Sequence, residues 1–211
     1  WLHCSHLIVE GKKMSKSLGN FYTLRDLLAY GYEGREIRWV FMGTHYRQQL
    51  NFTFQGLQDA HSALQRVDDF VGRLRDSEGE DKPISDEASA EIKNAEKAFL
   101  TALEDDLNIS GAIGALFDLV REMNRIMDKG DPGKTAREQT LNTLRKFDTV
   151  LGCLHIDSEQ SIPERVRQLA EQRQEARKQK DFETADAIRD QLAAEGWIIE
   201  DTSAGPRIKA R

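Results

Sequence analysis

The 211-residue sequence has only two cysteines and no long apolar run. Cys4 and Cys153 lie far apart, and neither belongs to a C-x-x-C or other metal-type spacing. This scarcity argues against a disulfide-based fold and favours reduced thiols in a cytoplasmic protein. Apolar residues make up 39% of the chain and occur in short runs, so we expect no membrane-spanning segment and no signal peptide within it.

The chain also lacks the strong positive charge of a protein that coats nucleic acid. Its formal net charge is −6, and this charge is unevenly distributed. Lys and Arg outnumber Asp and Glu by 7 to 4 in residues 1–50, are outnumbered 13 to 22 in residues 51–160, and balance at 10 each in residues 161–211. Any contact with nucleic acid is therefore expected to be local rather than spread over the surface.

A methionine start is missing as well, because the sequence opens at Trp1 inside the strand-like stretch "HLIVE". We therefore expect the chain to be the C-terminal part of a longer protein, with room for one or two small domains. No internal repeat and no low-complexity tract is present. Three polar segments rich in turn residues, 75–87, 128–135 and 155–163, divide the sequence.

Helical spacing of apolar residues dominates the regions between these breaks. Near residue 23, Thr23 and Asp26 have the spacing of a capping box, and Tyr22 can pack against Leu27. Four further segments place apolar side chains three or four residues apart, which predicts an antiparallel helical bundle. These segments are 57–74 (with His61 as the one polar exception), 92–103, 113–127 and 141–151.

The last fifty residues have a different pattern. They predict two helices that meet near Lys180 and Asp181, and Gly196 stands where a helix C-terminus favours glycine. The stretches "WIIED" and "PRIKA" then flank "TSAG", which is typical of two strands and a turn. The sequence thus predicts a mainly α chain that ends in a small α+β tip with a β-hairpin.

The stretch "KKMSKSLGN" at residues 12–20 fits neither an amphipathic helix nor an alternating strand. It follows a predicted strand (residues 6–10) and precedes a helix, a position where ligands bind in open α/β sheets. Lys13 and Lys16 are mobile cations suited to phosphate oxygens, and Ser15 and Ser17 add small hydroxyl donors. Although a lysine-rich loop is usually just solvated surface, K-M-S-K-S arises by chance in roughly one chain in ten thousand of this length.

"KMSKS" resembles the signature loop of class I aminoacyl-tRNA synthetases. "KMSKSLGNFYTLRDLL" with "HYRQQLNF" (45–52) is similar to the cysteinyl-tRNA synthetases in particular, as are "LEDDLNISGAIGALFDLVREMNR" (103–125) and "RKQKDFETADAIRDQLAAEGWIIEDTSAGPRIK" (177–209). The resemblance covers essentially the whole chain. It implies three parts: the end of a Rossmann-type catalytic core with a stem-contact region (1–50), a helical bundle (51–157) and an anticodon-binding tip (158–211).

The resemblance also implies ligation of cysteine to tRNA(Cys) through a cysteinyl-adenylate, with ATP and Mg. It places Lys16 on the ATP phosphates with Lys13 assisting, and it makes Lys13, Met14, Ser15, Lys16 and Ser17 an ATP-binding loop. The family's HIGH motif and zinc ligands are missing from these 211 residues, so we expect this chain alone to be inactive and the zinc to belong to the full-length enzyme. A cytoplasmic monomer is expected.

Contacts with tRNA are predicted at two places. The resemblance puts Tyr46 and Arg47 near the junction with the tRNA stem, and it puts anticodon reading in the C-terminal tip. There, residues 163–180 carry six cations against three anions, which favours either a basic ridge along RNA phosphates or a solvated helix with internal ion pairs. The candidate contacts are Arg173, Arg177, Lys178 and Trp197, with Trp197 alternatively a core residue under the hairpin.

No metal site is expected within the chain. His3, Cys4 and His6 cluster in sequence, but on a strand residue 3 points away from residues 4 and 6. Two other functions remain open. One is a cysteine ligase of thiol biosynthesis, which shares the loop but has no need of residues 177–209; the other is a non-catalytic tRNA-binding module, which has no need of the loop.

Overall fold

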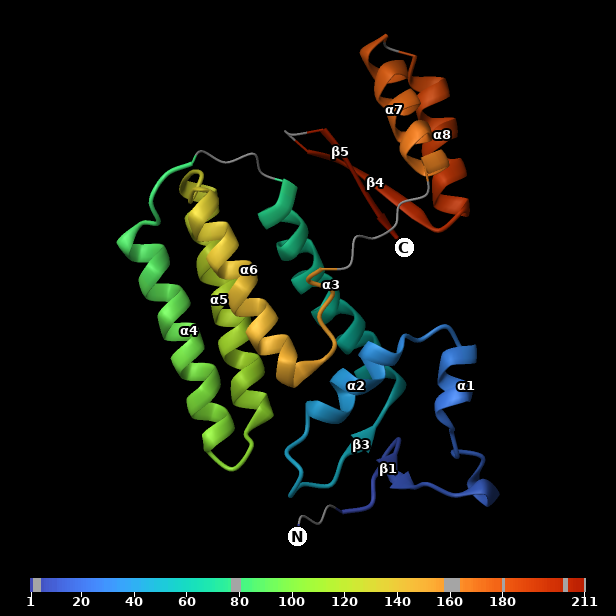
Figure 1. The fold of residues 1–211 in the computed structure, drawn as a ribbon. Coiled ribbons are helices and arrows are strands. Elements are labelled where there is room, and N and C mark those ends of the chain that lie inside the picture. Colours follow the sequence, from blue (N-terminus) through green and yellow to red (C-terminus); the bar gives the residue numbers. More distant parts are fainter. Residues whose placement is uncertain (2–4, 77–80, 158–163, 180, 203–204, 211) are drawn as a thin grey trace. The chain divides into compact units, whose positions relative to one another are not determined.

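The computed structural model describes residues 1, 5–76, 81–157, 164–179, 181–202 and 205–210 (Figure 1). The chain folds as two compact units, Trp1–Ile156 and Asp157–Arg211. Helices predominate in it, which confirms the predicted mainly α class. None of the helices in these described ranges is long and apolar enough to cross a membrane.

A small sheet begins the first unit. Its central strand β1 (Ile8–Val9) pairs antiparallel with β2 (Lys12–Lys13) and parallel with β3 (Asn51–Phe52). Only two residues, Glu10 and Gly11, connect β1 to β2, and their φ angles are 49° and 73°. Two successive left-handed residues give the twist that a two-residue hairpin needs. The strand predicted at residues 6–10 is therefore present but short, and the lysine stretch begins as its hairpin partner.

Two short helices follow, and each begins with a reciprocal cap. In front of α1 (Leu24–Ala29), the hydroxyl of Thr23 accepts from the amide of Asp26 and the Asp26 carboxylate accepts from the amide of Thr23. This confirms the capping box predicted from the sequence. A pair of glutamates caps α2 (Gly34–Met42) in the same way. The sequence analysis did not predict α2.

Four long helices form the predicted bundle, and they lie side by side in Figure 1. Their bounds are α3 (Phe54–Asp76), α4 (Asp86–Glu104), α5 (Ile109–Lys129) and α6 (Lys134–Leu151). The predicted apolar series points inward, and His61, its one polar member, lies at the surface with Nδ1 2.6 Å from Oε1 of buried Glu36. His61, the one polar residue in the apolar series of α3, thus forms a contact with α2.

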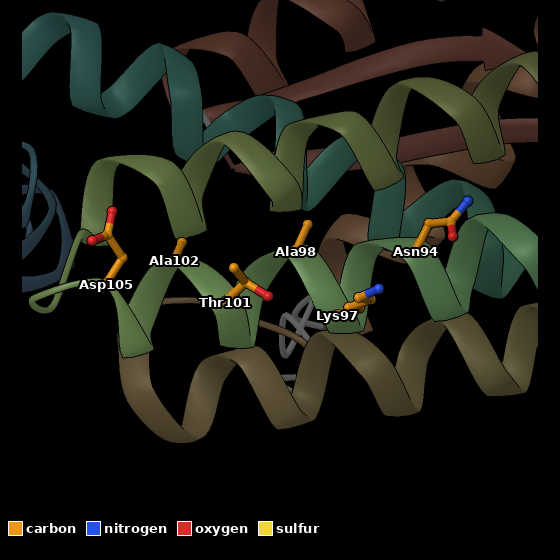
Figure 2. Close-up of a pocket in the computed structure, with 6 residues that line it drawn as sticks. All are labelled: Asn94, Lys97, Ala98, Thr101, Ala102 and Asp105. Carbon is orange, nitrogen blue, oxygen red and sulfur yellow. The ribbon is translucent and has the colours of Figure 1, made fainter.

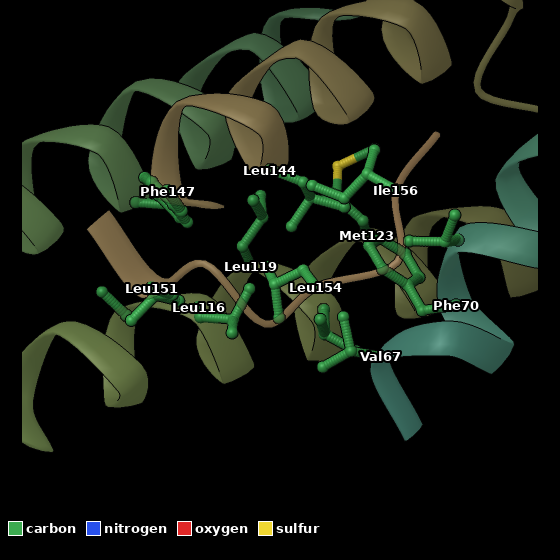
Figure 3. Close-up of a cluster of buried hydrophobic side chains, with 14 of the residues drawn as sticks. Val67, Phe70, Leu116, Leu119, Met123, Leu144, Phe147, Leu151, Leu154 and Ile156 are labelled. Carbon is green, nitrogen blue, oxygen red and sulfur yellow. The ribbon is translucent and has the colours of Figure 1, made fainter. Parts of the chain in front are cut away.

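The bundle core is made of large apolar side chains that are shielded from water (Figure 3). The rings of Phe99 on α4 and Phe147 on α6 stack with centroids 4.0 Å apart. Burial of each large side chain contributes about 1.5–3 kcal/mol, so this core gives the first unit most of its stability. The fully buried members include Phe70, Leu116, Leu119, Met123, Leu144 and Leu151.

Helix α2 is joined to the bundle at the C-terminus of α6. The guanidinium of Arg38 donates to the carbonyl of Leu151 and, at 3.1 Å, to the carbonyl of Val150. These carbonyls belong to the last turn of α6, which has no intrahelical partners for them and carries partial negative charge. Arg38 therefore caps one helix from another, and it attaches the sheet region to the bundle.

Cys153 lies directly after α6 as a buried free thiol. Its amide donates to the carboxylate of Asp148 at 2.9 Å. Burial, followed by the nearby Asp148 charge, raises the pKa of the Cys153 thiol to about 12. The thiol therefore stays protonated at neutral pH and behaves as a small core residue. Cys4 lies outside the described residues.

The second unit consists of two helices and a hairpin. Its elements are α7 (Glu164–Lys178), α8 (Phe182–Ala194), β4 (Trp197–Thr202) and β5 (Gly205–Ala210), as the sequence predicted. Buried Val166, Ile188 and Leu192 form its core, against which the inner face of the β4–β5 hairpin packs.

Candidate functional site

The lysine motif spans the second strand of the hairpin and the turn that follows it. Lys13 stands opposite Ile8 on β1, and one turn of 3₁₀ helix, η1 (Lys16–Leu18), comes next. Gly19 closes this turn in the left-handed region with φ 67°. Space around its α-carbon is open, so the backbone angle, not crowding, is what calls for glycine here.

The turn of the hairpin is attached to β3 and to the start of α3. The amide of Gly11 donates to Oδ1 of Asn51 at 2.8 Å. The carboxylate of Glu10 accepts from the amide of Phe54, the first residue of α3, at 3.0 Å. An acidic side chain at a helix N-terminus is favourable because it meets unpaired amides and positive partial charge. The hairpin that carries the lysines is thus held at the turn end.

Inside the motif, serine and asparagine side chains hold the backbone. Oγ of Ser15 accepts from the amide of Leu18 at 3.2 Å and lies 3.0 Å from Oγ of Ser17. The side chain of Asn20 bridges two backbone groups: its Oδ1 accepts from the amide of Ser15 at 2.9 Å, and its Nδ2 donates to the carbonyl of Lys13 at 3.1 Å. Asn20 ends the motif in the sequence, but this bridging contact was not predicted.

The side chain of Met14 points inward, whereas Lys13 and Lys16 on either side of it in the sequence are exposed to solvent. It is half-buried and packs against the apolar cluster that includes Val9, Leu27 and Phe52. A pocket of about 450 Å³ lies next to it, lined mainly by apolar side chains such as Leu7, Tyr22, Leu24, Ile37 and Phe41. Met14 therefore anchors the loop through its side chain, which is a packing role rather than a polar contact with a nucleotide.

Lys13 and Lys16 are exposed and available to an anion. Neither forms an ion pair with any residue that the structure describes, and Nζ of Lys16 lies 5.5 Å from the ring centroid of Phe21. Residues 13–17, which we call the lysine turn, carry two cations without a described ion-pair partner and two hydroxyls, and these groups can bind phosphate oxygens. The five predicted loop residues thus lie along one segment, with Lys13 at the end of β2, Met14 packed inward, and Ser15, Lys16 and Ser17 at the turn.

Tyr46 and Arg47 lie together with Asp106, about sixty residues further along the chain. The hydroxyl of Tyr46 donates to Oδ1 of Asp106 at 2.6 Å, and Nε of Arg47 donates to Oδ2 at 2.6 Å. Nε2 of His45 lies 2.9 Å from the backbone carbonyl of Asp106. Asp106 and Leu107 have φ angles of 53° and 57°, so these contacts hold a left-handed turn between α4 and α5. We refer to this contact of residues 45–47 with Asp106 as the Asp106 clasp.

The clasp compensates the charge of Arg47. The hydrogen bonds from Arg47 and then Tyr46 lower the pKa of Asp106 to about 2, and the same carboxylate raises the pKa of Arg47 and of the Tyr46 hydroxyl. A polar pocket of about 450 Å³ beside it also contains Asp105. The carboxylates make this corner less attractive to phosphate than the lysine turn is. The side chain of Arg47 nevertheless remains 65% exposed.

Replacing Asp106 with asparagine should remove an acid-sensitive contribution to stability. The folded-state pKa is depressed from 3.8 to about 2, so the carboxylate stabilises the fold fully above pH 4 and loses this effect as the pH falls toward 2. The difference in Tm between wild type and Asp106→Asn should therefore be constant at neutral pH and shrink below pH 4. Thermal unfolding followed by circular dichroism measures it. Asp105→Asn is the control, and a difference that persists at pH 2 contradicts the prediction.

A third pocket lies along one face of α4 (Figure 2). Its volume is about 410 Å³, and it is lined by Ala98 and Ala102 and by the polar side chains of Asn94, Lys97, Thr101 and Asp105. The depression is open to solvent and brings no group of ionisable side chains together. It is a shallow groove between side chains of α4 and offers no catalytic arrangement.

The predicted tRNA contacts in the second unit are distributed between its core and its surface. Arg177 and Lys178 are exposed on the last turn of α7, whereas Arg173 is only 7% exposed. Trp197 is half-buried and packs against the unit's apolar core, which supports its alternative role under the hairpin. Phe182, which the sequence analysis did not single out, is 60% exposed at the start of α8.

The described residues contain no group of three or more His, Cys, Asp or Glu side chains placed to hold a metal ion. His3 and Cys4 fall outside the part of the chain that the structure describes, so the trio with His6 has no geometry to report.

Three family models match successive parts of the sequence. Residues 1–62 match "tRNA synthetases class I (C) catalytic domain", residues 98–155 match "DALR domain", and residues 159–206 match "Cysteinyl-tRNA ligase anticodon binding domain". The lysine turn lies in the first match, the Asp106 clasp joins the first to the second, and Arg177 and Phe182 lie in the third.

Curated relatives match almost the whole chain. The cysteine–tRNA ligases of Chlamydia felis, Chlamydia pneumoniae and Protochlamydia amoebophila are 47%, 45% and 44% identical over 99% of it. The chain spans 44% of the length of each. Among solved structures, a ternary complex of Agrobacterium radiobacter K84 agnB2 LeuRS with tRNA and LeuAMS has a similar fold, with a TM-score of 0.53 and 21% identity over 72% of this chain and 22% of that one.

Proposed function

Because this chain belongs to the cysteine–tRNA ligase family of class I aminoacyl-tRNA synthetases, we propose that it acts within a longer enzyme that activates cysteine with ATP and transfers it to tRNA(Cys). The chain spans less than half the length of its relatives, so the rest of the catalytic domain is assigned to sequence outside residues 1–211. Within that enzyme, residues 1–211 supply the lysine turn, the bundle and the anticodon-binding unit.

One observation carries this proposal: the turn presents Lys13 and Lys16 to solvent without an ion-pair partner among the described residues. In adenylate formation, a carboxylate oxygen of cysteine attacks the α-phosphorus of ATP. The bond from this phosphorus to the bridging oxygen breaks, and pyrophosphate leaves with the electron pair. Cations that meet the growing negative charge on the pyrophosphate stabilise the transition state more than the ground state. Lys16 takes this role, and Lys13 assists it.

The second step transfers the cysteinyl group to the terminal ribose of tRNA, whose hydroxyl attacks the carbonyl carbon while AMP leaves. The chain contributes RNA contacts to this step. Arg177 and Lys178 offer exposed cations for phosphates, and exposed Phe182 offers a ring on which an unstacked base can stack. Tyr46 and Arg47 are proposed near the acceptor stem. Arg173 is left out of this surface because it is buried.

The proposal includes Mg with ATP, zinc bound by residues outside this chain, and a cytoplasmic, monomeric enzyme. Zinc is assigned to residues outside this chain because the zinc ligands of the family are missing from these 211 residues. A thiol-biosynthesis ligase would use the same turn, but it would join cysteine to a small amine and would have no use for an anticodon. The match of residues 159–206 to an anticodon-binding model favours tRNA as the acceptor.

The proposal predicts cysteine-dependent ATP–pyrophosphate exchange by the full-length enzyme and esterification of cysteine to tRNA(Cys). The same assays with serine and valine, and with a tRNA of another anticodon, provide the controls. Exchange without transfer to tRNA, but with transfer to a small amine, would support the thiol-biosynthesis alternative. Tight tRNA binding with no exchange for any amino acid would leave only the binding-module function.

A further inference from the structure

We propose that Asn20 is a positioning residue for adenylate formation, because it sets the distance and direction from which Lys13 and Lys16 meet the ATP phosphates. This inference deepens the proposed function and rests on it. It starts from the two hydrogen bonds of one side-chain amide, to the amide of Ser15 at 2.9 Å and to the carbonyl of Lys13 at 3.1 Å.

The two bonded groups flank Met14 on the backbone. In a parallel sheet, a residue pairs with the neighbouring strand in the same way. Its N–H donates to the carbonyl of the residue before its partner, and its carbonyl accepts from the N–H of the residue after that partner. The carboxamide of Asn20 thus acts as one extra peptide group beside β2, and it extends the paired backbone beyond Lys13. Asn20 is half-buried; its bond from the Ser15 amide is partly buried, whereas its bond to the Lys13 carbonyl is exposed.

The two hydrogen bonds of Asn20, which we call the Asn20 bridge, join the fixed hairpin to the more movable segment 15–19. The hairpin turn is attached to Asn51 and to the start of α3 through Glu10, and α1 begins with the Thr23 capping box. Between these anchors, the segment 15–19 is held by contacts of its own short side chains and by Asn20. Without the bridge, rotation about the backbone of Met14 and Ser15 would change the separation of the two lysines, since Lys13 lies on the strand and Lys16 on the turn beyond it.

Positioning matters here because both lysines are long and flexible and form no ion pair with a described residue. A cation accelerates adenylation only if it lies where charge develops in the transition state. The carboxamide supplies both a donor and an acceptor at fixed spacing, which neither aspartate nor serine reproduces. Asn20 has no contact of its own with the reacting atoms in this account and acts through Lys13 and Lys16.

The test is a double-mutant cycle in the full-length enzyme. Asn20→Leu keeps similar volume and removes both hydrogen bonds without adding charge. We expect it to lower kcat for cysteine-dependent ATP–pyrophosphate exchange about tenfold, or about 1.4 kcal/mol, and to leave KM for cysteine unchanged. On a Lys16→Ala background, Asn20→Leu should lower kcat less than twofold further, because Lys16, the main cation that it positions, is already gone and only the assisting Lys13 remains. Asn94→Leu, at an exposed site on α4, is the matched control.

Hydrogen exchange separates this inference from the proposed function. In Asn20→Leu, peptides covering residues 12–20 should exchange faster than in wild type, while the bundle peptides and Tm stay the same; this result does not depend on activity. Faster hydrogen exchange in Asn20→Leu with an unchanged kcat for ATP–pyrophosphate exchange would overturn the positioning role alone. Equal losses of kcat in the wild-type and Lys16→Ala backgrounds would also overturn it, because Asn20 would then act independently of Lys16. Absence of exchange activity in the wild type would instead overturn the proposed function.

Discussion

Replacing Lys16 with alanine in the full-length enzyme is expected to lower the rate of cysteinyl-adenylate formation about a hundredfold. Lys16 is exposed at the start of η1, and no described residue forms an ion pair with it, so its charge is available to the departing pyrophosphate. Loss of one preorganised group that stabilises transition-state charge costs on the order of 3 kcal/mol, which corresponds to about two powers of ten in rate.

The loss should appear in kcat, with KM for cysteine nearly unchanged, because leaving-group charge exists only in the transition state. Single-turnover adenylate formation measures the effect directly. Lys12→Ala is the matched control: Lys12 is also exposed and stands next to Lys13 on β2, where alternate residues face opposite sides of the strand. A defect confined to KM for cysteine, or an equal loss in the Lys12 variant, would show that Lys16 does not act on the pyrophosphate.

Features fixed by neighbouring residues could be predicted from the sequence. The capping box of Thr23 and Asp26 depends on a spacing of three residues, and the bundle follows from apolar residues three or four apart. The lysine motif was recognisable because its five residues are consecutive, from Lys13 at the end of β2 to Ser17 in η1. In each case the interaction partners are close in sequence, so the pattern contains the information.

Contacts between distant segments could not be predicted in this way. The Asp106 clasp depends on a left-handed turn of two residues that are not glycine, Asp106 and Leu107, and on three side chains sixty residues earlier. Arg38 likewise caps α6 from α2, across 113 positions of sequence. Nothing in the local pattern around either residue indicates its partner, since an exposed Arg or Asp is common at loops and helix ends.

The prediction of Arg173 as a tRNA contact gave charge more weight than the spacing of residues along the helix. Counting cations suggested a basic ridge along the predicted helix, yet Val166, Ala170 and Ala176 are buried and Arg173 falls on the same face of α7. A long side chain can bury its stem along apolar surface. The spacing of residues 166, 170, 173 and 176, which are four, three and three positions apart, already places them on one face of the helix. Arg177 and Lys178, one turn further on, remain exposed.

Removal of residues 157–211 from the full-length enzyme should leave adenylate formation intact and weaken transfer to tRNA. The lysine turn belongs to the unit Trp1–Ile156, which has its own apolar core, whereas Arg177 and Phe182 belong to the other unit. Stacking on an aromatic ring contributes about 1–3 kcal/mol per base, so loss of Phe182 and its neighbouring cations is expected to lower kcat/KM for tRNA by at least about tenfold.

Two further measurements distinguish reading of the anticodon from general attraction to RNA. Phosphate contacts release counterions, so wild type should lose tRNA affinity more steeply with added salt than the truncated enzyme does. Bases in a single-stranded loop are read by stacking and edge contacts, so the truncated enzyme should also discriminate less against a tRNA with a changed anticodon. Phe182→Ala, an exposed site whose replacement leaves the core of the unit intact, should reproduce part of the loss of discrimination with an unchanged salt dependence. If the truncated enzyme kept full anticodon discrimination, the reading surface would have to lie within residues 1–156, and Arg177, Lys178 and Phe182 would have no part in it.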